Sequence, residues 1–365
     1  MRYMLTSNNT LIVRGEASFR LLEGEASVLG AILERDRKII VGRERQLPVE
    51  ATTEADLEIR LGESSEIFEI EGSTIPASWQ VAADALTEMK QGKVMVIGAT
   101  DVGKSTLCTY LTNRLAARSL RLRVVDADIG QADIGPPTTM GSSVPTSSIS
   151  SLSDLIPEAL VFIGHTSPSQ VEMQIVHGLQ RLSSLTKDAL TIINTDGWVL
   201  NREAISYKIK MIAAIEPDLV IALASGTELQ PILSGSRAQS LGIDTAKEVL
   251  ARSRSNRREI RISSYRRFLQ GGRARTISLQ GVTVSTPDGF PSPQGPESRL
   301  LNGLIVGLLG NEDYLIQIGV LMALENHALS VYCRTTEGAR KVEVGYVKLS
   351  TDGTELGYFE PKEAH

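Results

Sequence analysis

The chain has 365 residues, which allows two or three domains at about 150 residues per domain. A hydrophobic fraction of 42% and a charged fraction of 22% exclude a disordered or collagen-like chain, and a formal charge of −5 argues against coating of nucleic acid by bulk charge. Two cysteines are too few for a disulfide framework, and no apolar run reaches the roughly 20 residues that span a bilayer, so we expect a cytoplasmic protein that makes no membrane contact.

Residues 1–88 are predicted to form a small antiparallel β-domain. Short apolar runs recur at 11–13, 27–33 and 38–41, and residues 57–61 alternate between apolar and charged side chains. Glycines between these runs are typical of turns that connect short strands. A short helix, residues 81–89, is expected to follow.

Residues 89–268 are predicted to form an α/β domain. Compact apolar strands joined by helices imply a parallel sheet that is covered on both faces. A stretch rich in Ser, Thr and Pro, residues 136–157, is expected to be a long functional loop. The expected strands are 93–97, 122–125, 160–163, 190–193 and 219–223, and the expected helices are 104–118, 170–182 and 205–215.

Residues 269–365 are predicted to form a second β-domain, because strand-like apolar runs return after residue 275. Just before them, residues 252–275 hold nine arginines and a single acidic residue, Glu259. The expected strands are 275–285, 304–306, 314–320, 328–332 and 342–349.

The strongest motif follows the first strand of the α/β domain and precedes a helix. It matches G-x-x-x-x-G-K-[ST], the phosphate-binding P-loop, whose glycines let backbone N–H groups face phosphate oxygens while the helix N-terminus adds its positive dipole end. Lys104 is expected to reach the β- and γ-phosphates of ATP, and the Ser105 hydroxyl is expected to bind Mg²⁺. The predicted ATP-binding residues are Gly98, Ala99, Thr100, Asp101, Val102, Gly103, Lys104, Ser105 and Thr106.

Two carboxylates, Asp126 and Asp128, end the next apolar strand. Side chains at i and i+2 on a strand point the same way, and here they emerge at the carboxyl edge of the sheet, where open α/β sheets bind ligands. One carboxylate is expected to hold Mg²⁺ or its water and the other to accept a proton from an attacking hydroxyl. The competing interpretation is an ordinary solvated strand end.

The arginine-dense stretch predicts a basic helix. Arg254, Arg258 and Arg261 share one helical face with Tyr265, and Arg257 lies beside them. Guanidinium groups that close over phosphates fit phosphoryl transfer. The alternative is a solvated basic helix without a ligand.

Polar loops follow two further strands. Trp198, in Asn-Thr-Asp-Gly-Trp, is placed to stack on a nucleic-acid base or, alternatively, to fill a domain interface. In the sequence Gly-His-Thr-Ser-Pro, Thr166 and Ser167 offer hydroxyls to a phosphodiester, unless the segment is a plain turn.

These motifs, in this order, resemble the polynucleotide 5′-hydroxyl kinases of RNA processing, a family that includes cleavage-factor subunits, pre-rRNA kinases and compact archaeal enzymes. The resemblance covers nearly the whole chain, and the absence of long extensions fits the compact archaeal form. It implies a central P-loop NTPase domain with a parallel sheet, flanked by N-terminal and C-terminal β-domains.

The resemblance also implies roles for individual residues. Asp128 would be the general base and a magnesium partner, with Ser105 and Asp126 as further magnesium ligands. The lid arginines are spaced R-x-x-x-R, which both Arg254/Arg258 and Arg257/Arg261 satisfy. With Lys104 and Asp128, the predicted catalytic residues are Arg254, Arg258 and Arg261. The predicted substrate-binding residues are Gln131, Thr166, Ser167, Trp198 and Arg257.

The expected activity is transfer of the γ-phosphate of ATP to the 5′-hydroxyl end of RNA, with RNA-processing proteins as partners and with DNA left open as a second acceptor. Two alternatives remain open at this point. One is a catalytically silent, ATP-bound scaffold of an RNA-processing complex, and the other is a P-loop NTPase switch.

Overall fold

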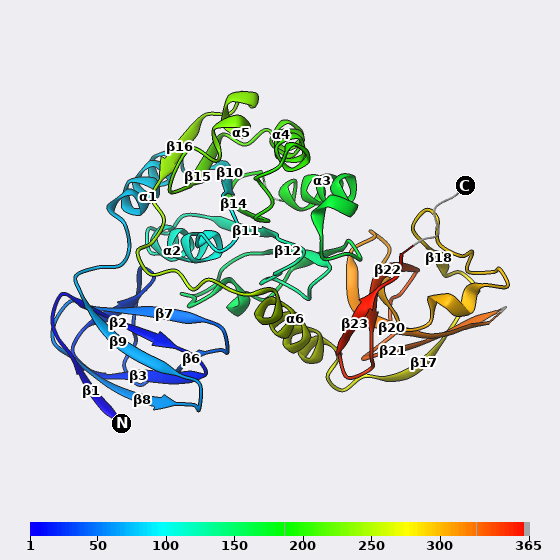
Figure 1. Ribbon diagram of the computed structural model, residues 1–365, viewed down its shortest axis with the longest axis horizontal. Helices are drawn as coiled ribbons and strands as arrows, with labels where there is room; N and C mark the ends of the chain where they lie inside the picture. The colour runs from blue at the N-terminus through cyan, green and yellow to red at the C-terminus, as the bar shows by residue number, and fades with distance from the viewer. Residues whose placement is uncertain (186, 326, 361–365) are drawn as a thin grey trace. The chain divides into compact units, whose positions relative to one another are not determined.

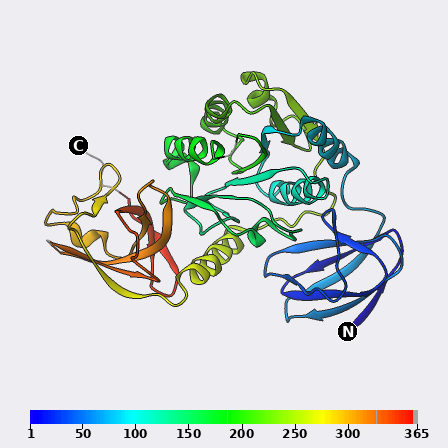
Figure 2. The same cartoon turned by 180° about the vertical axis from the view of Figure 1, so that it is seen from behind.

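The computed structural model describes residues 1–185, 187–325 and 327–360, and Figures 1 and 2 show the chain from opposite sides. The chain divides into two compact units, each built from segments that are distant in sequence. Unit 1 comprises residues 1–125, 143–156 and 183–256, and unit 2 comprises residues 126–142, 157–182 and 257–365. The domain boundaries at residues 88 and 268 stay a prediction.

The N-terminal part of unit 1 holds two antiparallel sheets, drawn in blue in Figure 1. The expected alternation in the 57–61 segment is confirmed for its first four residues, since Leu57 and Ile59 are fully buried and their charged neighbours are more exposed, whereas Leu61 is 43% exposed. The four-stranded sheet has the order β1 (Arg2–Leu5), β8 (Ala55–Leu61), β3 (Ala17–Glu23) and β6 (Ile39–Val41). The five-stranded sheet has the order β5 (Ala31–Ile32), β4 (Ala26–Val28), β7 (Gln46–Ala51), β2 (Asn9–Arg14) and β9 (Glu66–Glu71).

The nucleotide-binding sheet of unit 1 is parallel, as the apolar runs predict. Strands β14 (Leu190–Thr195), β10 (Gly92–Ile97), β15 (Leu219–Leu223) and β16 (Ser240–Ile243) are neighbours in that order, and β11 (Leu122–Ala127) lies beside β14. Every residue of β14 and β15 is buried, which explains why these strands read as continuous apolar runs. The helices of this part are α1 (Ala77–Met89), α2 (Lys104–Ala116), α4 (Arg202–Ile215) and α5 (Gln230–Gly235), with the short 3₁₀ helix η1 (Leu152–Asp154).

One expectation about strand direction is wrong. The 160–163 run belongs to β13 (Ala159–Phe162), which pairs antiparallel with β12 (Thr139–Ser143) rather than joining a parallel ladder. The 136–157 segment, predicted to be a loop, therefore contains a strand. An apolar run reports burial but not direction, and antiparallel neighbours need no crossover helix between them. Helix α3 (Glu172–Ser183) follows β13, after the short helix η2 (Pro168–Gln170).

The C-terminal part of unit 2 is a β-domain, as predicted. Its sheet is antiparallel except where β18 runs parallel to β22. The helix that carries the predicted lid arginines, α6 (Arg254–Leu269), buries Tyr265 and Leu269 in one of the two apolar clusters of this domain. The strand order is β17 (Arg273–Ser278), β21 (Ala328–Cys333), β20 (Leu315–Glu325), β19 (Leu304–Leu309), β22 (Lys341–Leu349) and β18 (Thr283–Ser285), with β23 (Glu355–Tyr358) paired to β22 and the short helix η3 (Ser298–Leu301) before β19.

A P-loop core with flanking β-domains is thus the observed fold class. Among the described residues, no helix is both long and apolar enough to cross a membrane.

Candidate functional site

The P-loop of unit 1 connects β10 to α2. Gly103, the N-cap of α2, has a φ of +98°, which favours glycine, and a Cβ placed there would meet no atom within 4 Å. The Lys104 ammonium donates a hydrogen bond to the Ala99 carbonyl at 2.8 Å and so lies across its own loop. No acidic residue stands in the first turn of α2, which leaves the positive end of the helix dipole available to an anion. These features fit a triphosphate.

Two glycines allow close backbone contacts around the P-loop. A Cβ on Gly98 would lie 2.6 Å from the Leu223 carbonyl oxygen. A Cβ on Gly197, in the loop after β14, would lie 2.5–2.6 Å from atoms of Thr100. The Thr100 hydroxyl also donates to the Gly197 carbonyl at 3.3 Å. The loop that carries Trp198 is therefore packed directly on the P-loop, and sequence reasoning assigned no role to Gly197.

The predicted magnesium ligand Ser105 is held by a residue that sequence reasoning did not assign. The Asn194 amide, at the end of β14, donates to the Ser105 hydroxyl at 3.3 Å. Asn194 is 1% exposed, so its amide orientation is set by its surroundings. Asn194 lies near the end of a buried strand that neighbours the P-loop strand, and this position could have indicated that it contacts the P-loop.

Trp198 is anchored through a buried ion pair. The Asp196 carboxylate accepts the Lys208 ammonium of α4 at 2.7 Å and the Tyr207 hydroxyl at 3.0 Å. The second oxygen of Asp196 accepts the backbone N–H of Trp198 at 3.0 Å. The Trp198 ring, which is half-buried, lies 5.6 Å from the Tyr207 ring. The backbone that presents Trp198 is thus tied to a helix.

A long-range contact supports the P-loop at Asp101. This residue has a φ of +59°, and its carboxylate accepts the backbone N–H of Arg252 at 3.0 Å. The Arg252 side chain donates in turn to the Glu44 carbonyl of the N-terminal β-domain at 3.1 Å. The 151 positions between Asp101 and Arg252 leave no local pattern from which this contact could be predicted.

In unit 2, Asp126 organises the loop that follows β11. Its oxygens accept three backbone N–H groups, from Asp128 at 3.2 Å, Asp133 at 2.6 Å and Ile134 at 3.1 Å. Burial, together with the nearby carboxylates of Asp133 and Asp128, raises the pKa of Asp126 to about 7. These bonds indicate a structural role for Asp126, and its role as a magnesium ligand stays a prediction.

Asp128 lies in the same loop and is only half-buried. One of its oxygens accepts the backbone N–H groups of Gly130 at 3.1 Å and Gln131 at 2.9 Å. The Gln131 amide donates to the Arg257 carbonyl at 3.4 Å. The structure therefore brings three predicted site residues together: Asp128, Gln131 and Arg257 of the lid helix.

The loop after β13 presents Thr166 and Ser167. His165 is buried, and its Nδ1 accepts the Ser167 N–H at 2.8 Å, which folds the loop back on itself. Burial lowers the pKa of His165 from its ordinary value of 6.5. A neutral imidazole is the form that accepts this hydrogen bond.

The predicted lid arginines differ in the contacts that they make. Arg261 makes a bidentate ion pair with Glu355 of β23, at 2.7 and 2.8 Å, and Arg258 donates to the Glu355 carbonyl. Arg254 is exposed in unit 1. The ion pair places Arg261 as an anchor of α6, and the choice of a catalytic lid arginine stays a prediction.

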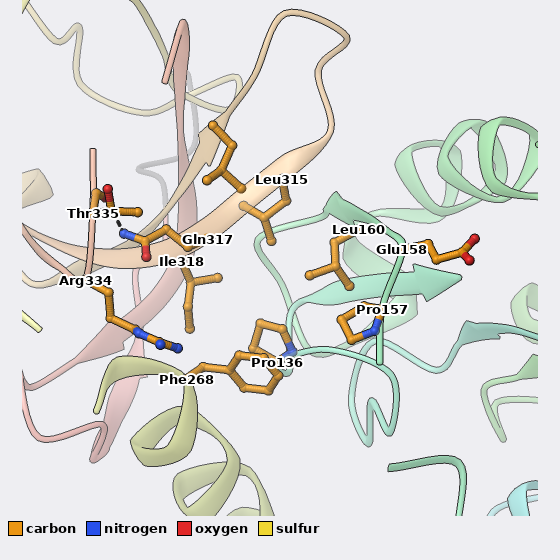
Figure 3. Close-up of a pocket in the computed structure, with 11 residues that line it drawn as sticks. Pro136, Pro157, Glu158, Leu160, Phe268, Leu315, Gln317, Ile318, Arg334 and Thr335 are labelled. Atoms are coloured by element: carbon orange, nitrogen blue, oxygen red, sulfur yellow. Dashed lines mark hydrogen bonds between the residues drawn. The ribbon is translucent and has the colours of Figure 1, made fainter. Parts of the chain in front are cut away.

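A pocket of about 530 Å³ lies elsewhere in unit 2. Figure 3 shows Leu160, Phe268 and Ile318 directed into it, with Arg334 and Glu158 among its lining residues. None of the predicted site residues lines it, so it does not belong to the candidate active site.

The described residues offer few protein ligands for Mg²⁺. Within residues 1–185, 187–325 and 327–360 no group of three or more His, Cys, Asp or Glu side chains is arranged to hold a metal. Mg²⁺ beside a nucleotide takes one or two protein ligands together with phosphate oxygens and water, so a dedicated cluster of protein ligands is not required.

A P-loop after the first strand of a parallel sheet defines a nucleotide-binding protein, and comparison with known proteins narrows the class. The family model of the mRNA cleavage and polyadenylation factor CLP1 P-loop matches residues 98–271. The chain is 33% identical over 340 residues to a polyribonucleotide 5′-hydroxyl-kinase of Pyrococcus horikoshii, covering 78% of this chain and 94% of the relative. A Pyrococcus furiosus kinase of the same name is 27% identical over 343 residues, covering 78% and 96%.

The chain therefore belongs to the polyribonucleotide 5′-hydroxyl-kinase family. The solved structure of the wild-type Clp1p–Pcf11p complex aligns with a TM-score of 0.72 over 95% of this chain and 97% of that chain. At 12% identity this similarity shows a shared fold.

Proposed function

We propose that this chain is an ATP-dependent kinase that phosphorylates the 5′-hydroxyl end of RNA. The observation that carries the proposal is the P-loop, residues 98–106, in a chain whose relatives are named polyribonucleotide 5′-hydroxyl-kinases. Its cytoplasmic location stays a prediction. The similarity to a Clp1p that was solved with Pcf11p supports an RNA-processing protein as a partner.

In the proposed reaction the 5′-hydroxyl oxygen attacks the γ-phosphorus of ATP. The new P–O bond forms as the bond to the β–γ bridging oxygen breaks, so that ADP leaves. Asp128 accepts the hydroxyl proton, and Lys104 and the P-loop amides spread the charge of the transferring group. Positioning dominates this chemistry, so Asn194 and Asp196 contribute by holding Ser105 and the Trp198 loop.

Mg²⁺, when bound, would neutralise phosphate charge, with Ser105 and Asp128 as the residues that would hold it directly or through water. Trp198 would stack on the terminal base, and Thr166, Ser167, Gln131 and Arg257 would contact the acceptor end.

A phosphate-transfer assay tests the proposal directly. Labelled ATP and a 5′-hydroxyl oligoribonucleotide should give a labelled oligonucleotide with the wild-type chain. Asp128→Asn should lower kcat about 10²- to 10⁴-fold while ATP binding is nearly unchanged. Asp288→Asn, at an exposed position in unit 2, is the matched control and should remain fully active. Full activity of Asp128→Asn would remove this residue from the mechanism.

The acceptor site is tested at Trp198. Trp198→Ala should raise the KM for the oligonucleotide and leave ATP affinity unchanged, whereas Trp198→Phe, which keeps a ring, should lose less. Because few phosphates are contacted, KM should depend only weakly on salt. ATP binding without any phosphate transfer would instead support the catalytically silent scaffold. Release of free phosphate without a labelled oligonucleotide would support the NTPase switch.

A further inference from the structure

The C-terminal sheet supports the Thr166 loop directly. The Tyr346 backbone N–H of β22 donates to the Gly164 carbonyl at 2.8 Å. Gly164 has a φ of +79°, and a Cβ there would lie 2.8 Å from the Gly345 Cα, so the two backbones are in close contact. The His165 ring lies 5.1 Å from the Tyr346 ring and 5.2 Å from the Tyr358 ring. The loop is therefore held by β22 and β23 within unit 2.

Tyr358 contacts this loop and remains accessible. Its hydroxyl and that of Thr166 lie 2.6 Å apart, across 192 positions of sequence. Its ring is inclined by 33° to the His165 ring, and the residue is still 39% exposed. The tyrosine is thus fixed on one side by a buried imidazole and offers aromatic surface to solvent.

The same strand is anchored at its other end. Glu355 of β23 is 3% exposed and forms the bidentate pair with Arg261 of the lid helix. The strand that carries Tyr358 is therefore attached both to the loop after β13 and to α6.

Tyr358 is also connected to the candidate base. A Cβ on Gly130 would lie 2.7 Å from the Thr166 carbonyl oxygen, so the Asp128 loop and the Thr166 loop touch through this glycine. The Asp128 carboxylate accepts the Gly130 N–H. An acceptor end that reaches Asp128 and Thr166 consequently lies near the Tyr358 ring.

We propose that Tyr358 extends the acceptor site onto the C-terminal β-domain by stacking on a base downstream of the 5′-terminal nucleotide of single-stranded RNA. This inference rests on the proposed kinase function, in which Trp198 takes the terminal base. Stacking on an aromatic ring tolerates any base, so the contact would recognise a polynucleotide rather than a sequence. A mononucleotide acceptor would not use it.

The test compares two acceptors, a nucleoside 3′-monophosphate and a ten-nucleotide single-stranded RNA, both with a free 5′-hydroxyl. Tyr358→Leu and Tyr358→Phe both lose the hydroxyl that contacts Thr166, so they are compared with each other. Relative to Tyr358→Phe, Tyr358→Leu should raise the KM for the decamer by roughly tenfold and leave the mononucleotide KM, the ATP KM and kcat unchanged. Tyr358→Phe, which keeps the ring, should keep the preference for the decamer. Tyr314→Leu, a half-buried tyrosine of the same domain, is the control and should change neither.

Equal effects of Tyr358→Leu on both acceptors would overturn the stacking role, as would unchanged decamer binding measured by fluorescence anisotropy. Anisotropy also separates the two proposals. If the wild-type chain phosphorylates neither acceptor, the kinase function fails, whereas the contribution of Tyr358 to RNA binding is still decided by the titration.

Discussion

The ammonium of Lys208 and the carboxylate of Asp196 lie 2.7 Å apart in the interior of unit 1, with side-chain exposures of 0% and 4%. The pair sits at the base of the loop that presents Trp198, and the same carboxylate accepts the Trp198 N–H. Burying a charge pair costs desolvation free energy, so we expect this pair to act mainly by fixing the geometry of the loop.

Lys208→Met should lower the free energy of unfolding by about 3–5 kcal/mol, because it leaves the Asp196 charge buried without its cation. Thermal unfolding measures the loss. The double variant with Asp196→Asn should be less unstable than the sum of the single variants. Additive effects would show that the two groups do not act as a pair.

Gly197→Ala should weaken ATP binding, because its Cβ would displace Thr100 of the P-loop. Even a small displacement of this backbone misplaces several phosphate donors at once, so we expect at least a tenfold rise in the ATP dissociation constant, or about 1.4 kcal/mol. Isothermal titration with ATP measures it. Gly242→Ala is the matched control, since no atom lies within 4 Å of its added Cβ. Unchanged ATP affinity in Gly197→Ala would refute the contact.

Glu355→Gln and Arg261→Lys should each destabilise the chain, by about 3 kcal/mol, because the bidentate pair between α6 and β23 is largely buried. If Arg261 acts only as an anchor, both variants should lower kcat to the same extent. Thermal unfolding and kcat are measured side by side. A stable Arg261→Lys variant with a large, selective loss of kcat would instead assign Arg261 to catalysis.

The buried His165 predicts a pH dependence. Its pKa in the folded chain lies below 6.5 because burial disfavours the imidazolium. Between the two pKa values the unfolded chain binds a proton at this site that the native chain does not, so the stability contributed by the neutral His165 is full above pH 6.5 and falls as the pH drops. Asp126, whose pKa is raised to about 7, acts in the opposite direction over this range, because its protonation favours the native chain as the pH falls. The contribution of His165 is therefore measured as a difference: between pH 7.5 and pH 5.5 the melting temperature of the wild type should fall relative to that of His165→Gln. The exposed His177→Gln variant should keep the wild-type pH dependence.

The P-loop, the paired aspartates and most of the strands and helices could be predicted from contiguous residues, whereas β12, β16 and α5 were not expected. Each depends on local spacing: two glycines and a lysine within nine positions, carboxylates two residues apart on a strand, and apolar runs of strand length. The direction of β13 could not be predicted, because an apolar run has the same composition in either direction.

Much of what positions the candidate site depends on partners far apart in sequence. Arg261 meets Glu355 across 94 positions and Thr166 meets Tyr358 across 192. A helix of regularly spaced arginines has the same pattern whether its guanidinium groups meet a phosphate or a buried glutamate. Local motifs thus predicted nucleotide binding, and their resemblance to a known family predicted the reaction, both from sequence alone. Long-range packing decided which charged groups hold the fold together, since only the folded chain brings their partners within hydrogen-bonding distance.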